Sequence, residues 1–151
     1  MNKKIDNIRK TRSYLLNLIE GLSDEQLNKV PGGFQNNIIW NLGHLIAAQQ
    51  GVGYIRGGVQ PAVEESFLAL YRPGTKPERT FDSTEIAQVK ERLLTSLDQF
   101  EADYQNRQFD NYTPWTTRYG VALASIEDAI DFLAYHEGLH AGVIMAIKKL
   151  V

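Results

Sequence analysis

Apolar residues recur in steps of three, four and seven along much of this chain, which is the spacing of helices that bury one face. At the start, Ile5, Ile8, Leu15 and Ile19 follow this spacing and predict an amphipathic helix over about residues 3–21. Leu22 extends the same stripe, and Gly21 weakens the end of the helix.

The second predicted helix is apolar on nearly every side. Residues 36–55 read NNIIWNLGHLIAAQQGVGYI, so this helix should be the most buried. Before it, Ser23 and Gln26 have the spacing of a capping box and predict a short helical turn that ends at Pro31. We expect fraying at its far end, where four glycines cluster: Gly51, Gly53, Gly57 and Gly58.

A long irregular connection is predicted next, over residues 58–81, because it contains three prolines. One helical turn is expected within it, around Glu64 to Leu70. A third helix then begins after a cap at Ser83 or Thr84, and its apolar positions are Ile86, Val89, Leu93, Leu97, Phe100 and Tyr104.

Residues 107–124 have the composition of a loop but contain four aromatic residues, Phe109, Tyr112, Trp115 and Tyr119. A solvent-exposed linker rarely has so many, so we expect this loop to pack back across the helices. Ser125 and Asp128 then predict the start of a fourth helix, again as a capping box.

Four helices with two long joints indicate an all-α fold, and a four-helix bundle with long crossover loops is the architecture we predict. Up-and-down connectivity and an irregular helical domain both remain open, because periodicity does not separate them. With 151 residues, of which 43% are hydrophobic, the chain suits one domain over residues 1–151.

Composition limits the partners. A net charge of −2 and a pI near 5.9 give no clustered basic face for nucleic acid. The basic residues near the start, Lys3, Lys4, Arg9, Lys10 and Arg12, are interpreted as the solvated side of a helix. No signal peptide or long uncharged apolar window is found, so we expect a cytoplasmic protein that acts away from membranes. The absence of cysteine leaves imidazole and carboxylate as the strong metal ligands.

All three histidines of the chain lie on predicted helices. His136 and His140 are one turn apart on the inward stripe of the fourth helix, which is the spacing of a metal-binding pair. In an apolar core each ring would otherwise need its own polar partner, and a lone His44 would usually be a hydrogen-bonded core residue. Together the three predict one metal site with His44 as the third ligand.

The letters HEGLH also match the HExxH motif of zinc peptidases. Such peptidases take a third ligand from downstream, and only AGVIMAIKKLV follows His140. The third ligand must therefore come from upstream, where His44 is the simplest choice. Three imidazoles leave coordination positions open, as in catalytic rather than structural sites.

The segments NIIWNLGHLIAAQQ and YHEGLHAGVIMAIKKL resemble the two signature helices of the DinB-like superfamily, which includes proteins similar to YfiT. The resemblance extends over nearly the whole chain. It implies a four-helix bundle with one metal ion held by three histidines, which correspond here to His44, His136 and His140. The superfamily includes metal-dependent thiol S-transferases, a thiol-dependent isomerase and proposed hydrolases, so the resemblance leaves the reaction open.

We therefore expect a metal-dependent thiol S-transferase or small-molecule hydrolase that uses Zn or Ni, with a low-molecular-weight thiol as a further cofactor in the transferase case. The alternative is a non-catalytic metal- or ligand-binding bundle that dimerises, and a homodimer is expected in either case. Glu137 is a weaker candidate: it could orient a histidine or act as a general base, or it could face another helix.

Overall fold

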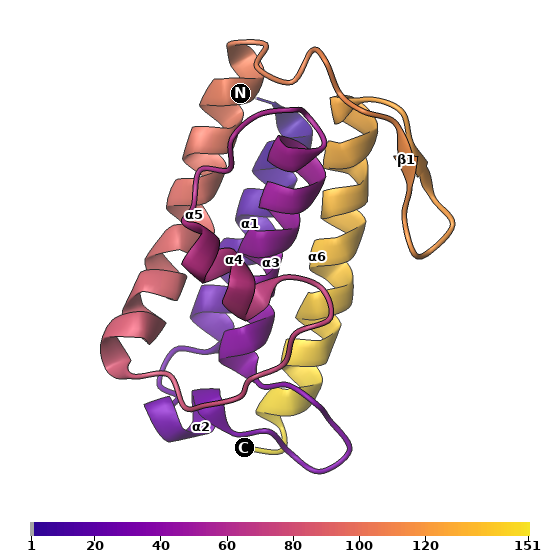
Figure 1. Cartoon of the computed structure of the whole chain (residues 1–151). Helices are drawn as coiled ribbons and strands as arrows, with labels where there is room; N and C mark the ends of the chain where they lie inside the picture. Colours follow the sequence, from indigo (N-terminus) through magenta and orange to yellow (C-terminus); the bar gives the residue numbers. More distant parts are fainter. Residues whose placement is uncertain (1) are drawn as a thin grey trace.

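Four long helices form the bundle that the sequence predicts (Figure 1). The structure is a computed structural model that describes residues 2–151. The long helices are α1 (Lys3–Leu18), α3 (Ile38–Gln49), α5 (Ser83–Gln105) and α6 (Ile126–Lys148). Both α1 and α3 pack against α5 and α6, so α1 and α3 occupy opposite corners of the bundle.

One long connection crosses the length of the bundle. In Figure 1, α1 and α6 run in one direction and α3 and α5 in the other. Residues 56–82 therefore return along the bundle between the parallel helices α3 and α5, and they include the short helix α4 (Glu65–Tyr71). This confirms a crossover loop, and α4 lies close to the helical turn expected from the sequence. The short helix α2 (Asp24–Asn28) lies in the joint between α1 and α3.

Side-chain caps fix the starts of all four long helices, and two helix boundaries differ from prediction. α1 stops at Leu18 instead of near residue 21, because Ile19 already leaves the helical conformation and caps the end. α5 is capped by Asp82, one residue before the expected caps at Ser83 or Thr84. The Asp82 carboxylate accepts a hydrogen bond from the Glu85 backbone N–H at 2.9 Å, and the Glu85 carboxylate accepts one from the Asp82 backbone N–H. Asp82 and Glu85 therefore form the capping box. The predicted capping box of Ser125 is confirmed.

Beyond α3 the chain stays helical where fraying was expected. Gln50–Ile55 forms a π-helix, η1, that continues through Gly51 and Gly53. The predicted end of the helix near Ile55 is thus confirmed, but the expected fraying at Gly51 and Gly53 was wrong, because Gly53 serves packing: a Cβ atom there would lie 2.7 Å from the Phe100 ring of α5. The missing side chain thus lets α5 approach, and the contact holds the helix in place.

The aromatic loop after α5 packs back onto the bundle, as predicted. Phe109 is buried against the rings of Tyr54 and Phe100. The Tyr112 hydroxyl donates a hydrogen bond to the carbonyl of Val52 in η1 at 3.0 Å. The loop also forms a small antiparallel pair, β1 (Trp115–Thr116) and β2 (Ala122–Leu123), which was not predicted because two residues are too few to show alternation.

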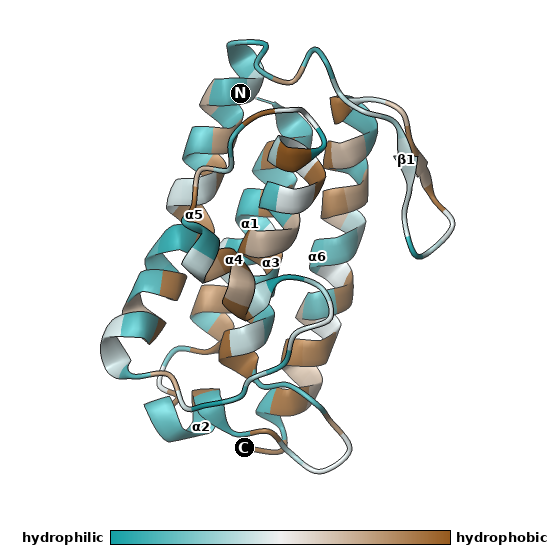
Figure 2. Cartoon of the chain, in the orientation of Figure 1, coloured by the Kyte–Doolittle hydropathy of each residue, from teal (hydrophilic) through white to brown (hydrophobic). Residues whose placement is uncertain are grey.

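A polar layer crosses the interior and separates two apolar clusters. On α1, Arg12 lies between Ile8 of one cluster and Leu15 of the other. The layer also includes buried polar residues from the other three helices, namely Gln49, Ser96, His44, His136 and Glu137. Figure 2 shows hydrophobic and hydrophilic residues interleaved along α1, α5 and α6, as expected for helices with one buried face, whereas every residue of α3 is buried, as predicted. No helix within residues 2–151 has the length and apolar character needed to span a bilayer.

Candidate metal centre

The three histidines converge at one side of the polar layer. His44 comes from α3, and His136 and His140 come from the antiparallel neighbour α6. One ring nitrogen from each lies within 4.8 Å of the others. The ring centroids are separated by 4.5 Å to 5.2 Å. Three imidazole nitrogens this close together form a donor set that suits a divalent transition metal ion.

Hydrogen bonds fix which nitrogen two of the rings offer. The Nδ1 atom of His44 lies 2.7 Å from the backbone carbonyl of Tyr71, and Nδ1 of His140 lies 2.8 Å from Oδ1 of Asn41. Both partners only accept hydrogen bonds, so each Nδ1 carries the proton and each Nε2 keeps a free lone pair. This is the arrangement in which outer partners orient metal-binding histidines.

Asn41 is itself held in place, and this orients its oxygen. Its side-chain nitrogen donates to the carbonyl of Asn37 at 2.7 Å and to Oδ1 of Asn36 at 2.9 Å. The amide oxygen is left to face His140. Sequence reasoning missed Asn41, although a polar residue in the middle of the most apolar helix was a signal. Tyr71 acts through its backbone, so its side chain gave no signal.

Gly43 explains how the carbonyl of Tyr71 reaches the site. A Cβ atom at Gly43 would clash with the ring of Tyr71, so only glycine lets α4 pack this closely on α3. The neighbouring residue, His44, then lies beneath the last turn of α4. On its other side, Trp40 stacks on the His44 ring with centroids 4.7 Å apart and planes at 12°. The short sequence WNLGH therefore supplies His44, two residues that shape its surroundings (Trp40 and Gly43), and Asn41, which orients His140.

Burial keeps the three imidazoles neutral. It lowers the pKa of His136 to about 3 and that of His140 to about 4, and it also lowers the pKa of His44. Repulsion from a neighbouring imidazole, if it were protonated, and from the Arg118 guanidinium lowers the pKa of His136 and His140 further. Neutral imidazole is the form that binds metal, so these rings meet that requirement at neutral pH without losing a proton.

The histidines open into a cleft of about 620 Å³. Its walls include aromatic rings of three segments, Trp40 of α3, Trp115 of β1 and Phe132 of α6. Two arginines, Arg56 and Arg118, also line it. The crossover connection closes one edge at Pro73 and Gly74. A small molecule in this cleft would contact the histidine cluster and the aromatic loop at the same time.

Glu137 points to a different part of the polar layer. Its Oε1 atom accepts hydrogen bonds from Arg12 at 2.7 Å and 2.9 Å, and both side chains are almost completely buried. Burial raises the pKa of the Glu137 carboxyl, and the guanidinium of Arg12 opposes that rise. Among residues 2–151, the cleft lining includes His136 and His140 but not Glu137. The structure therefore places this carboxylate on Arg12.

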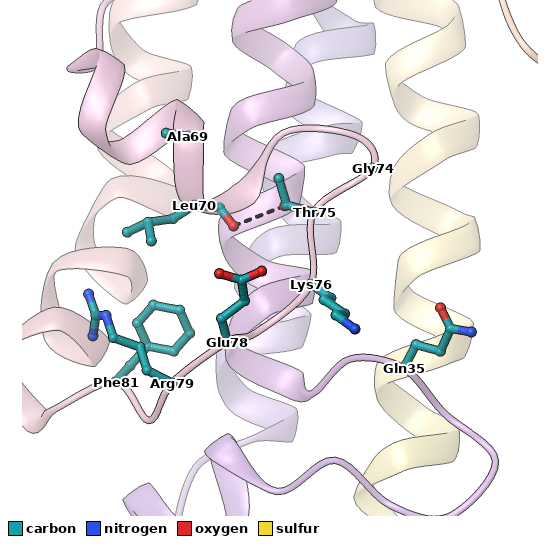
Figure 3. A pocket seen from close by; sticks show the side chains of 9 residues that line it. All are labelled: Gln35, Ala69, Leu70, Gly74, Thr75, Lys76, Glu78, Arg79 and Phe81. Atoms are coloured by element: carbon teal, nitrogen blue, oxygen red, sulfur yellow. Dashed lines mark hydrogen bonds between the residues drawn. The ribbon is translucent and has the colours of Figure 1, made fainter.

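A second hollow, of about 670 Å³, lies beneath the crossover connection on the other side of Gly74. It is lined by Lys76, Glu78 and Arg79, among others. Figure 3 shows the side chains of Lys76 and Arg79 pointing in different directions, and Arg79 pairs with Glu85 outside the hollow. The charged groups do not converge, so the histidine cleft is the better candidate for chemistry.

Comparison with known proteins gives a family. A search of curated proteins found no match. The model of the DinB superfamily matches residues 7–144, which include His44, His136 and His140 and parts of all four long helices. This match covers most of the chain and agrees with the helical fold, so the chain belongs to the DinB superfamily.

Proposed function

We propose that this protein is a metal-dependent enzyme that acts on small molecules, with His44, His136 and His140 as the ligands of one Zn or Ni ion. The observation that carries the proposal is the convergence of three neutral imidazoles on one side of a cleft. The acceptors at Nδ1 of His44 and His140 leave their Nε2 atoms with a free lone pair, and these atoms would hold the ion. Three protein ligands leave coordination positions free for a reactant.

Such an ion, when bound, would lower the pKa of a coordinated thiol or water molecule so that its anion forms near neutral pH. The side chains around the site have complementary tasks. Trp40 and Phe132 give the cleft apolar walls beside the histidines, and the hydrogen bonds to Tyr71 and Asn41 keep the His44 and His140 rings from turning away.

Thiol transfer fits this cleft better than hydrolysis. Among the described residues that line it, none is Asp or Glu, and Glu137 is bound to Arg12. Attack by water usually needs a side chain that accepts a proton, whereas a thiol ionises more readily and attacks as its anion. In the transfer reaction, sulfur bonds to an electrophilic carbon, the leaving group departs with its electron pair, and the thiol proton passes to solvent.

The metal site is tested first. Elemental analysis of the purified protein should find about one Zn or Ni ion per chain. His140→Ala should remove most of this metal and lower thermal stability only when metal is present, because a ligand of the folded state stabilises it by mass action. Leu139→Ala, at the adjacent and more exposed position, is the control and should keep the metal. Equal destabilisation with and without metal would support simple core packing instead.

The reaction is tested on the metal-loaded protein. Conjugation of low-molecular-weight thiols to monobromobimane should be accelerated, and both EDTA and His140→Ala should abolish the effect. Acceleration of 4-nitrophenyl acetate hydrolysis instead would favour the hydrolase. A metal-loaded protein inactive in both assays, across a panel of thiols, would favour the non-catalytic metal-binding alternative. The small-molecule substrate and the homodimer stay predictions.

A further inference from the structure

The arginines of this protein divide into two groups. Most of them form ion pairs with a carboxylate, and these are Arg9, Arg12, Arg72, Arg79, Arg92 and Arg107. Within residues 2–151, Arg56 and Arg118 form no such pair. These two are also the arginines that line the histidine cleft. Both described arginines without a carboxylate partner therefore lie at the candidate site.

Arg56 is held in a position that suits recognition of an anion. Its guanidinium lies over the Trp115 ring, 4.4 Å from the centroid. A guanidinium stacked by its face keeps the N–H groups at its edge available, and these match the two oxygens of a carboxylate. The surrounding contacts reinforce this: the Arg56 carbonyl accepts a bond from the Thr113 backbone, and Trp115 donates to Tyr112.

Arg118 also lines the cleft and lies in the turn between β1 and β2. Its guanidinium is 5.3 Å from the centroid of the Tyr119 ring, and its charge acts on all three histidines. The described cleft lining combines two arginines and three neutral imidazoles with no carboxylate. The remaining walls are largely apolar and include Val52, Ile55 and Phe132.

We propose that the cleft selects an organic anion of small-molecule size, whose carboxylate or phosphate is held by Arg56 and Arg118 while its apolar body lies along Phe132 and Ile55. This deepens the proposed function, on which it rests for the identity of the cleft as the substrate site. The arginines are specificity residues in this proposal. A neutral molecule of the same shape would leave their charges without a partner and bind more weakly.

The test uses the full chain treated with EDTA, so that no probe can bind through the metal. Three probes share one aromatic body: 3-phenylpropionate, its neutral amide, and phenethyl phosphate. Affinities are measured by ligand-observed NMR at pH 8 and at two salt concentrations. We expect at least one anion to bind about tenfold more tightly than the amide, since hydrogen bonds to charged groups are among the stronger ones. This preference should decrease at high salt.

Arg56→Gln and Arg118→Gln should each weaken binding of the preferred anion, and the double variant should remove its advantage over the amide. Arg79→Gln is the matched control, because it removes one positive charge at the second hollow. Equal affinities of anions and amide, or an equal effect of Arg79→Gln, would overturn the inference. Zinc binding is measured in parallel and should be unchanged in the double variant. Failure of the wild-type protein to bind zinc would contradict the proposed function. The anion affinities would still test the inference, because they are measured without metal.

Discussion

The buried polar layer has an inner half around Arg12 and an outer half around the histidines, and the two halves differ in how their polar groups are hydrogen-bonded. On the inner half, Arg12 donates hydrogen bonds to Glu137, Gln49 and Ser96 and to carbonyls of α3 and α5, so its donors have partners. On the outer half, His44 and His140 have partners at Nδ1 only. The inner half joins the four helices and lies away from the cleft, and within it Oε2 of Glu137 is buried without a hydrogen-bond partner. The outer half is open and keeps lone pairs available beside a cleft.

Adjacent residues of α6 belong to different halves. Glu137 and His136 lie about 100° apart around the helix, which directs the carboxylate to Arg12 and the imidazole to the cleft. Burial of each is tolerable for a different reason: the carboxylate has a guanidinium partner, while the imidazole stays neutral. Burial alone therefore does not identify a functional polar residue, whereas ring nitrogens with a free lone pair beside a cleft are candidates for metal binding.

The largest effect should come from breaking the inner half. Arg12→Met leaves the Glu137 carboxylate buried without its counter-ion, which typically costs about 3–5 kcal/mol. We expect a loss of this size in the free energy of unfolding, measured by urea denaturation of the metal-free protein. Glu137→Gln should also destabilise, because it removes the charge that Arg12 faces.

The double variant Arg12→Met with Glu137→Leu is the control for this prediction. Replacement of a whole buried ion pair by apolar side chains is often neutral, so it should recover much of the lost stability. If Glu137→Gln instead left stability intact and abolished turnover at full metal content, Glu137 would belong functionally to the outer half.

Acid should act first on the outer half. Because burial lowers the pKa of His136 to about 3 and of His140 to about 4, the unfolded chain, with a histidine pKa near 6.5, binds more protons than the folded one between these values. Stability of the metal-free protein is therefore fully present above about pH 6.5 and is lost as pH falls toward 3. Carboxylates with a lowered pKa, such as Glu85, add their loss only below about pH 4.5.

Urea midpoints measured between pH 7.5 and 4.5 would test this. His136→Gln and His140→Gln should each flatten the slope in this range, whereas Arg12→Met should shift the whole curve. A slope that is the same in both histidine variants as in the wild type would contradict the assignment of the acid response to the outer half.

Asn41→Leu should weaken metal binding in the outer half while the hydrogen bonds of the inner half stay intact. It removes the acceptor at Nδ1 of His140, so the ring loses its fixed orientation. Outer partners of metal-binding histidines typically contribute 10–100-fold in affinity, and we expect a loss of about that size for zinc, measured by competition with a chelator. Asn36→Ala, which removes only a bond to the Asn41 amide, is the control and should lose less.

The local spacing of apolar and polar residues predicted much of this structure. What it could not predict are contacts between residues far apart in the sequence. The spacing of His136 and His140 gave the pair on α6, and the apolar stretch around His44 gave its buried helix. The pairing of Glu137 with Arg12 depends on contacts between residues 125 positions apart, which periodicity does not encode. The role of Tyr71 was equally hidden, because its carbonyl reaches His44 only through the packing at Gly43.

The smallest expected effects on stability come from glycine-to-alanine variants. They should distinguish the glycine that packs beside His44 from glycines on the exposed face of α6. Gly43→Ala places a methyl group against the ring of Tyr71, so we expect a loss of about 1–3 kcal/mol in stability and weaker zinc binding as the Tyr71 carbonyl moves from His44. Gly138→Ala and Gly142→Ala meet open space on α6 and should each stabilise by about 0.5–1 kcal/mol, because alanine favours the helix. Thermal unfolding and zinc titration of the three variants compare the same glycine-to-alanine change at a packed position and at two open positions. If Gly43→Ala behaved like the α6 variants, the close packing of α4 would not be what positions His44.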